Sequence, residues 1–201
     1  MGTALPQVNT GEFVSAVALG DSSTCAILAE GTVRCWGANG SGQLGYGDTA
    51  MRGATLSNFP ILQLGGKVLA IGMAGSELGK SARTCAVLEE GSVKCWGAND
   101  YLTADGGVDE AIGRLGYGDT ISRGAAPNQM GTNLPAIDLG DVSAPREVVV
   151  GAGHTCVRFE GRKVKCFGEN FSGALGLGDS KNRGFAPEQM GNDLPFVDLG
   201  R

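Results

Sequence analysis

The sequence predicts an all-β protein made of three repeated units, and three observations lead to this fold class. A phrase of the form T-C-x9-C-[WF]-G occurs three times, as TCAILAEGTVRCWG, TCAVLEEGSVKCWG and TCVRFEGRKVKCFG. No stretch shows a sustained apolar period of about 3.6 residues, so helices are not indicated. The 35 glycines recur at fixed places between short strand-like runs, where they mark turns. A fixed period of this kind is typical of a repeat architecture.

The first copy of the phrase predicts a β-hairpin whose two cysteines face each other. Nine residues separate the cysteines, with alternating apolar residues on both sides of the pair Glu30-Gly31. If residues 29–31 form a three-residue loop with glycine last, Leu28 faces Thr32. The count along both strands then brings Cys25 opposite Cys35, within reach of a disulfide.

The other two copies follow the same count. It brings Cys85 opposite Cys95, and it brings Cys156 opposite Cys166 although Gly161 comes one position earlier there, which requires a different turn type. Six cysteines allow fifteen pairings, and the repeat favours one disulfide per hairpin. Free buried thiols are the alternative, but a paired count that recurs at one spacing is typical of an oxidising compartment. Zinc and other cofactors are not expected, because the spacing is long and the chain has one histidine.

The charge of the chain disfavours two classes of partner. A net charge of −5 provides no basic surface for phosphate contacts, so nucleic acid is not an expected partner. No run of about 18 apolar residues occurs, so membrane insertion is not expected either. Basic residues alternate with apolar ones in the second strand of each hairpin, as at Arg34 and Lys94, and this alternation predicts a solvated strand face.

A second motif divides the chain into units. MG-x-x-LP-x-[VI]-x-LG occurs at 130–140 and 190–200, with a related copy at the start of the chain and a degraded one at 55–65. An LG[YL]GD element follows each hairpin, and its spacing places eleven extra residues in the second unit, on a surface loop. The predicted units are 1–54, 55–129 with an insertion at 101–111, 130–189, and 190–201 as the opening strand of a further unit.

The two ends of the chain carry the same strand motif, which suggests assembly. An unpaired edge strand exposes backbone donors and acceptors, so we expect a further repeat or another copy of the chain to cover it. Because Met1 occupies an interior repeat position, we also expect a longer secreted protein whose signal peptide lies outside this sequence. The predicted assembly strands include Leu5, Pro6, Val8, Leu194, Pro195 and Val197.

The motif C-[AV]-[IVR]-L-x-E-G-[TS]-V-[RK]-C-W-G-x-N-x-x-G-x-LG-[YL]-GD resembles the RCC1 repeat family, in its cysteine-containing, bacterial-type form. The resemblance covers essentially the whole chain. It implies that each repeat forms a four-stranded blade of a β-propeller, which usually has seven blades in this family. Three units are too few to close a ring. We therefore expect an incomplete or open propeller, an oligomer that shares blades, or an open spiral.

The resemblance also suggests functions that the residues can test. An exchange-factor role is disfavoured because the chain has no basic tail. Photoreceptor relatives rely on tryptophan clusters, whereas Trp36, Trp96 and Phe167 occur once per repeat and are expected in the core. An inhibitor-like role through aromatic loops has little support from three tyrosines.

Paired charges recur four residues apart after each hairpin. A charged binding surface presented once per unit is one interpretation. We favour a structural one, in which the aspartate caps a turn and the arginine pairs with it. The pairs are Asp48 with Arg52, Asp119 with Arg123, and Asp179 with Arg183.

Two asparagines lie in N-x-S sequons and are candidate glycosylation sites. Asn39 and Asn170 occupy equivalent positions after CWG or CFG. Asn99 occupies the same position without a sequon, so a turn asparagine is the alternative interpretation.

The insertion is the best candidate for a specific contact, because only one unit has it. Its acidic residues lack the ligand order of a calcium loop. The candidate binding residues are Tyr101, Asp105, Asp109 and Glu110.

Together these features predict a non-enzymatic protein, since no base, nucleophile and orienting group are brought together by the motifs. The favoured function is that of an extracellular structural or assembly protein, associating head-to-tail through its matching ends with other copies or further repeats. The alternative is a protein- or glycan-recognition module, part of a complete seven-bladed propeller of the inhibitor or exchange-factor type.

Overall fold

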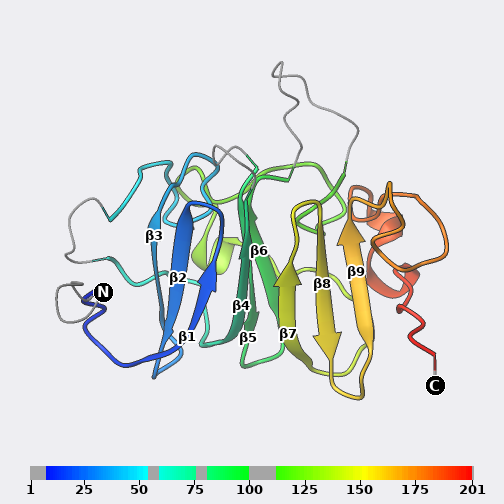
Figure 1. Ribbon diagram of the computed structural model, residues 1–201, viewed down its shortest axis with the longest axis horizontal. Coiled ribbons are helices and arrows are strands. Elements are labelled where there is room, and N and C mark those ends of the chain that lie inside the picture. The colour runs from blue at the N-terminus through cyan, green and yellow to red at the C-terminus, as the bar shows by residue number, and fades with distance from the viewer. Residues whose placement is uncertain (1–7, 54–58, 76–80, 100–111, 201) are drawn as a thin grey trace, which may run out of the picture.

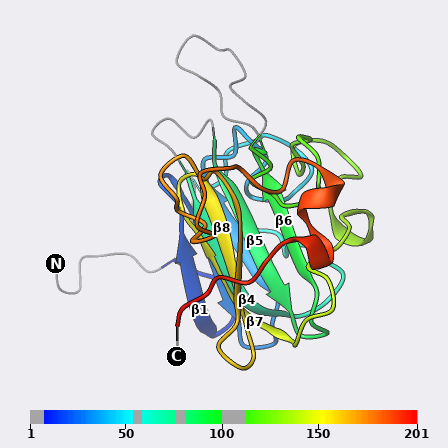
Figure 2. The same ribbon diagram turned by 90° about the vertical axis from the view of Figure 1, so that its right-hand side faces the viewer.

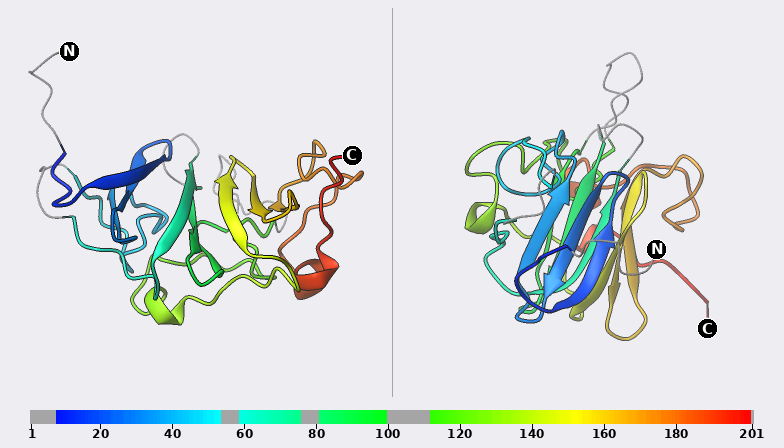
Figure 3. Two further views of the ribbon diagram at one scale, coloured as in Figure 1. Left: turned by 90° about the horizontal axis from the view of Figure 1, so that it is seen from below. Right: turned by 60° about the vertical axis from the view of Figure 1, so that its left-hand side comes forward.

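The computed structural model describes residues 8–53, 59–75, 81–99 and 112–200. These residues form three antiparallel sheets of three strands each, which follow one another in chain order and do not close into a ring (Figure 1, Figure 3). We call the sheets blades 1, 2 and 3. Their strands are β1 (Val14–Leu19), β2 (Ser23–Leu28) and β3 (Val33–Gly37); β4 (Val68–Ala74), β5 (Arg83–Leu88) and β6 (Val93–Gly97); and β7 (Pro145–Val150), β8 (His154–Phe159) and β9 (Val164–Gly168).

Each predicted hairpin is present with the predicted register. Cys25 lies opposite Cys35, and Leu28 N–H donates to Thr32 O over 2.8 Å to close the loop. All three disulfides form within their hairpins, with Cα–Cα distances of 4.1, 4.0 and 4.1 Å. These short separations are typical of pairs that exchange no ladder hydrogen bonds. The count from the sequence is thus confirmed in every blade.

The third hairpin turns differently, as its sequence predicts. In the first two loops the left-handed position is filled by glycine, Gly31 and Gly91, with φ of 77° and 92°. In the third loop both Gly161 and Arg162 have positive φ, 79° and 66°. Arg162 occupies the position that glycine holds in the other blades. Positive φ is sterically unfavourable for a residue with a Cβ, so this conformation destabilises the turn relative to glycine.

The outer edge of each blade differs from the four-stranded sheet that the resemblance implies. Two irregular segments replace a regular fourth strand. One makes an isolated bridge to the end of the third strand, as between Gly37 and Arg52. The other is the proline-containing segment (Phe59-Pro60 in blade 1, Leu-Pro in the other two), called the Leu-Pro segment below. In blade 1 it makes one 2.8 Å backbone bond to that strand, from Leu62 N–H to Val33 O. Proline in this segment has no N–H, so it cannot continue a ladder.

The C-terminal segment shows the same arrangement. The sequence predicts an opening strand at 190–201, but the structure has a short 3₁₀ turn at Gly191–Asp193 followed by an extended segment. Val197 N–H donates to Val164 O in β9, so the segment lies along blade 3 (Figure 2). The predicted boundaries begin each unit with this motif, whereas its hydrogen bond joins it to the blade before it.

Apolar side chains gather between blades rather than within them. One core lies between blades 1 and 2 and includes Ile27, Met73 and Trp96. A second lies between blades 2 and 3 and includes Val87 and Phe159. Each blade is therefore stabilised by burying its faces against its neighbours.

The prediction of a solvated face on the second hairpin strand was wrong for two lysines. Lys94 and Lys165 are only 8% and 2% exposed. Lys94 Nζ donates to Leu64 O and Gly131 O over 2.8 and 3.0 Å, and Lys165 Nζ donates to two equivalent carbonyls over 2.9 Å each. Burial lowers the pKa of both amines. These bonds tie the loops between blades to the strands.

Within the described ranges, no helix is long and apolar enough to cross a membrane.

Replacing Arg162 by glycine should stabilise the protein by about 1 kcal/mol, because glycine adopts positive φ without a steric penalty. The matched change Gly91→Ala places a side chain at φ 92° and should destabilise the protein by a similar amount. Chemical denaturation of both variants under non-reducing conditions measures the two effects. A stabilising Gly91→Ala, or no gain from Arg162→Gly, would contradict the turn assignment.

Candidate functional site

The surfaces between blades are the candidate functional site, because they are built from repeated residues and the outer faces of blades 1 and 3 are partly exposed in the described part of the chain. We define the front face of a blade as the side turned toward the preceding blade, and the rear face as the side turned toward the following one. Front-face residues are Val17, Leu19 and Trp36 in blade 1; Ile71, Met73 and Trp96 in blade 2; and Val148, Val150 and Phe167 in blade 3. Rear-face residues include Ala18 and Ile27 in blade 1, Val87 and Leu115 in blade 2, and Val149, Arg158 and Leu175 in blade 3.

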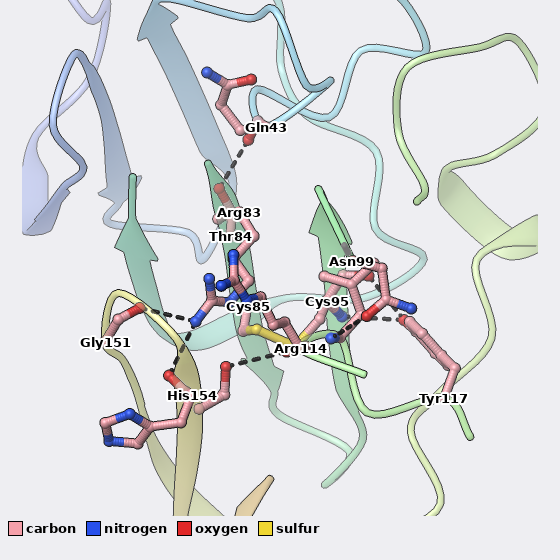
Figure 4. The surroundings of a disulfide bond; sticks show 12 residues. Gln43, Arg83, Thr84, Cys85, Cys95, Asn99, Arg114, Tyr117, Gly151 and His154 are labelled. Atoms are coloured by element: carbon pink, nitrogen blue, oxygen red, sulfur yellow. Dashed lines mark hydrogen bonds between the residues drawn. A yellow bond between two sulfur atoms is a disulfide. The ribbon is translucent and has the colours of Figure 1, made fainter. Parts of the chain in front are cut away.

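A carbonyl on the rear face receives hydrogen bonds from the next blade. Gln43 O accepts a bond from Thr84 Oγ1 of blade 2 over 2.8 Å (Figure 4). It also accepts one from Trp96 Nε1 of the same blade over 2.9 Å. Between blades 2 and 3, Thr155 Oγ1 donates to Arg114 O over 3.3 Å. These bonds satisfy polar groups that the interface buries.

Glycines on the rear face allow the next blade to approach closely. A Cβ at Gly42 would lie 2.4 Å from Ala125 N, and a Cβ at Gly113 would lie 2.0 Å from the carbonyl carbon of Gly184. No real side chain tolerates such distances from backbone atoms. The G-x-LG part of the repeat is therefore required by blade contact as well as by turn geometry.

Two buried arginines join blades 2 and 3 (Figure 4). Arg83 donates through Nη1 to Ala152 O over 3.0 Å, and through Nη2 to Gly151 O and His154 O over 2.8 and 3.1 Å. Arg114 Nη2 lies 3.3 Å from Glu169 Oε2. Burial, and then the charge of Arg114, lower the pKa of Arg83, while Glu169 opposes the shift. By donating hydrogen bonds to three carbonyls of blade 3, the Arg83 guanidinium has a structural role and connects the two blades.

His154 contributes its carbonyl to this connector, and its ring is half-buried. Burial, followed by the charge of Arg83, lowers the pKa of the ring. Across the residues that the structure describes, no group of three His, Cys, Asp or Glu side chains is placed to hold a metal ion.

Two tyrosine hydroxyls complete the open edge of the third strand, a role that the sequence analysis missed. Tyr117 Oη accepts from Cys95 N–H over 3.0 Å and lies 2.9 Å from Cys95 O. Tyr46 makes the same contacts with Cys35. Burial raises the pKa of both phenols. The signal was the tyrosine of the LG[YL]GD element, which is Leu177 in blade 3.

The repeated Asp–Arg pairs have the structural role that we favoured. Asp119 accepts two bonds from Arg123, over 3.0 and 2.6 Å, and Asp48 accepts an equivalent pair from Arg52. The hydrogen bond from Arg52 is the main cause of the lowered pKa of Asp48. Burial raises the pKa of Asp119, but the bonds from Arg123 and the backbone outweigh it, so the net shift is downward.

The two sequon asparagines are buried inside the same turns. Asn39 Nδ2 donates to Asp48 O and to its carboxylate over 2.9 and 3.0 Å, and Asn39 Oδ1 accepts from Leu44 N–H. Asn170 makes the equivalent bonds and has no exposed surface. Attachment of a glycan would break these bonds, so the geometry supports the turn interpretation for both.

Several predicted site residues fall outside the described ranges. The candidate binding loop with Tyr101, Asp105, Asp109 and Glu110 lies there, as do Leu5 and Pro6. Of the other predicted assembly residues, Val8 is exposed and Leu194 is fully buried against blade 3.

Among the described residues, the front face of blade 1 is exposed along β1, whereas Ala26 and Leu28 of β2 on the same face are fully buried. Val17 and Leu19 are 61% and 68% exposed, whereas Met73, the counterpart of Leu19 in blade 2, is 7% exposed. Trp36 stacks on Phe59 at 5.1 Å between ring centroids, on the same side of the blade. The chain therefore presents a face whose counterparts are interior surfaces.

Asp119→Asn should make the protein less stable at neutral pH and less sensitive to acid. The folded-state pKa of Asp119 is lowered, so its contribution is present above about pH 4 and is lost as the pH falls through the lowered value. We expect a loss of about 1–2 kcal/mol at pH 7 and a shallower decline of stability between about pH 4 and pH 2. Denaturation at several pH values measures this, with Glu12→Gln as an exposed control. Equal slopes in variant and parent would refute the assignment.

Comparisons with known proteins agree with this geometry. Residues 14–43 match the model of the Regulator of chromosome condensation (RCC1) repeat. The Ultraviolet-B receptor UVR8 of Arabidopsis thaliana is 34% identical over 110 residues, which are 55% of this chain and 21% of the relative. The chain thus spans about a fifth of that protein's length.

Solved structures share the fold at low sequence identity. Human WBSCR16 matches with a TM-score of 0.57 and 20% identity, over 88% of this chain and 37% of that one. Prp20p of Saccharomyces cerevisiae, the yeast RCC1, matches with a TM-score of 0.56 and 18% identity, over 92% of this chain and 38% of that one. The same yeast protein bound to Kap60 gives a TM-score of 0.55. The chain is therefore similar to proteins of the RCC1 repeat family in one matched repeat, in sequence over 110 residues and in fold.

Proposed function

We propose that this chain is a non-enzymatic, extracellular assembly protein whose blades associate head-to-tail. In this proposal the front face of blade 1 binds the rear face of blade 3 in another copy. The contact is made by blade faces, which extends the sequence-based expectation of contact between end strands. The observation that carries the proposal is the exposure of Val17 and Leu19 on the front face of blade 1, because their counterparts in blades 2 and 3 pack into the cores between blades.

The donors needed for such a joint are present on blade 1. Thr24 and Trp36 lie opposite each other in the same register as Thr84 and Trp96. The latter two donate to the carbonyl of Gln43 across the joint between blades 1 and 2. Thr24 and Trp36 are therefore suited to bind the same kind of carbonyl on another blade.

The matching acceptor is found on blade 3. Ala174 precedes the LG element, as Gln43 and Arg114 do in the first two blades. Gly173 holds the position of Gly42 and has φ of 72°, and a Cβ built there would meet no backbone of a following blade. The rear face of blade 3 thus retains the carbonyl and the room that the internal joints use.

The disulfides support an extracellular setting. Each of the six cysteines is paired within its own hairpin. Disulfides of this kind persist in oxidising environments and are rare in the cytosol.

A second candidate function follows from the length of the chain relative to its structural relatives. It covers 37% and 38% of the chain in two structures of yeast RCC1. Further RCC1-type blades could then cover the front face of blade 1 and complete a ring, and the ring could recognise a protein or a glycan through the loop at 101–111. Fusion of this chain to further blades that yields a monodisperse ring would support that candidate.

Light scattering after size exclusion tests the assembly proposal. We expect the chain to form concentration-dependent oligomers, and Val17→Glu with Leu19→Glu to weaken association by at least about 100-fold, because two carboxylates would be buried without partners. Ile121→Glu is the control, since Ile121 is exposed on the internal blade 2.

A chain that is folded and monomeric at every concentration would contradict head-to-tail assembly. Equal loss of association in the control would show that charge in general, rather than the front face, controls the contact.

A further inference from the structure

One cross-strand pair sets the rear face of blade 3 apart from the other two rear faces. The pair joins the first and second strands of each blade at the same register position. It is Ala16 opposite Ile27 in blade 1, Ala70 opposite Val87 in blade 2, and Glu147 opposite Arg158 in blade 3.

The apolar members of this pair belong to the cores between blades. Ile27 is buried between blades 1 and 2, and Val87 is buried between blades 2 and 3, with Ala70 packed beside it. These positions therefore lie where one blade meets the next. A following blade docked on blade 3 in the same way would cover Glu147 and Arg158.

In a single chain, water hydrates both members of the charged pair. Arg158 Nε lies 2.7 Å from Glu147 Oε2, and both side chains are 50% exposed. An exposed ion pair of this kind contributes little to stability. Removing both charges from water against an apolar surface costs much more than their mutual attraction returns.

The front face that would cover the pair is apolar apart from Thr24 and Trp36, the donors matched to the carbonyl of Ala174. Its exposed residues on blade 1 include Val14, Val17 and Leu19, and none of them offers a hydrogen bond to a charge. In the joint, Glu147 and Arg158 would keep their mutual hydrogen bond, but both charged groups would lose their hydration. Terminal units of repeat proteins commonly carry polar outer faces for solubility.

We propose that the Glu147–Arg158 pair weakens the joint between copies relative to the joints within a copy. The pair makes head-to-tail association reversible and favours, as a tight partner for blade 1, an RCC1-type blade with Ala and Ile or Val at these two positions. This inference rests on the proposed head-to-tail function and specifies the strength and selectivity of the contact. The blade-1 front face is its binding surface, and the second copy is its occupant.

Replacing the pair by the residues of blade 1 tests the inference. Glu147→Ala with Arg158→Ile should tighten self-association by at least about 10-fold in sedimentation velocity, because the desolvation cost is removed. Glu147→Ala with Arg158→Val, which reproduces blade 2, should act in the same direction. Arg158→Ile alone leaves a carboxylate to be buried without a partner and should weaken association below the parent level.

A neighbouring ion pair provides a matched control. Arg146 and Glu160 lie 3.3 Å apart on the same blade, with side chains 48% and 64% exposed. Their counterparts in blades 1 and 2, which are Ser15 and Leu69 for Arg146 and Ala29 and Glu89 for Glu160, do not belong to the cores between blades. Arg146→Ala with Glu160→Ala removes the same charges and should leave the association constant unchanged. Thermal unfolding of every variant shows that the blades remain folded.

The outcomes separate this inference from the proposed function. If the parent associates and the Ala/Ile variant associates no more tightly, the inference is wrong and head-to-tail assembly stands. If the parent is monomeric and the Ala/Ile variant associates through Val17 and Leu19, the inference is supported and assembly of the parent is refuted. If neither associates, both are refuted.

Discussion

A three-stranded sheet with two apolar faces cannot bury both faces by itself, and the rest of this structure depends on that constraint. Each blade is stapled by one disulfide, but the staple lies within the hairpin and joins no blade to another. The apolar cores lie between neighbouring blades instead. Stability therefore comes from stacking, as in other repeat proteins where each unit contacts its neighbours. In the described part of the chain, blade 2 has a neighbouring blade on both faces, whereas the outer faces of blades 1 and 3 expose Val17, Leu19 and Val149.

The polar groups of the repeat serve the same stacking. Gln43 O accepts a hydrogen bond from the next blade, and Arg83 donates hydrogen bonds to carbonyls of blade 3. Lys94 donates to carbonyls of the loops on either side of its blade. Buried donors and acceptors are costly unless they are paired, so these bonds fix the distance and orientation of each blade. At the distance that these bonds set, the backbone of blade 2 lies too close to Gly42 for a side chain there. This explains the glycine two positions before the LG element.

Local pairing could be predicted from the sequence, and contacts between loops and strands could not. Counting from the loop at 29–31 was enough to place Cys25 opposite Cys35, because strand register is set by turn length. Alternation also placed Lys94 on the opposite side from Cys95, but alternation cannot say that carbonyls of Leu64 and Gly131 lie there. The Leu-Pro segments were expected as strands and instead make one backbone bond each to the third strand, since proline removes a donor. The hydroxyl of Tyr117 was missed because its partner, the backbone of Cys95, lies 22 residues away in sequence.

Chemical cross-linking between the two free faces tests the central claim most directly. In the joint between blades 1 and 2, Ala18 on the rear face and Met73 on the front face share one core. Their counterparts at the free ends are Val149 and Leu19. A mixture of Leu19→Cys and Val149→Cys proteins, treated with a short bifunctional maleimide, should give cross-linked dimers that join one variant to the other. Absence of these dimers, or equal cross-linking within the Leu19→Cys protein alone, would contradict front-to-rear association.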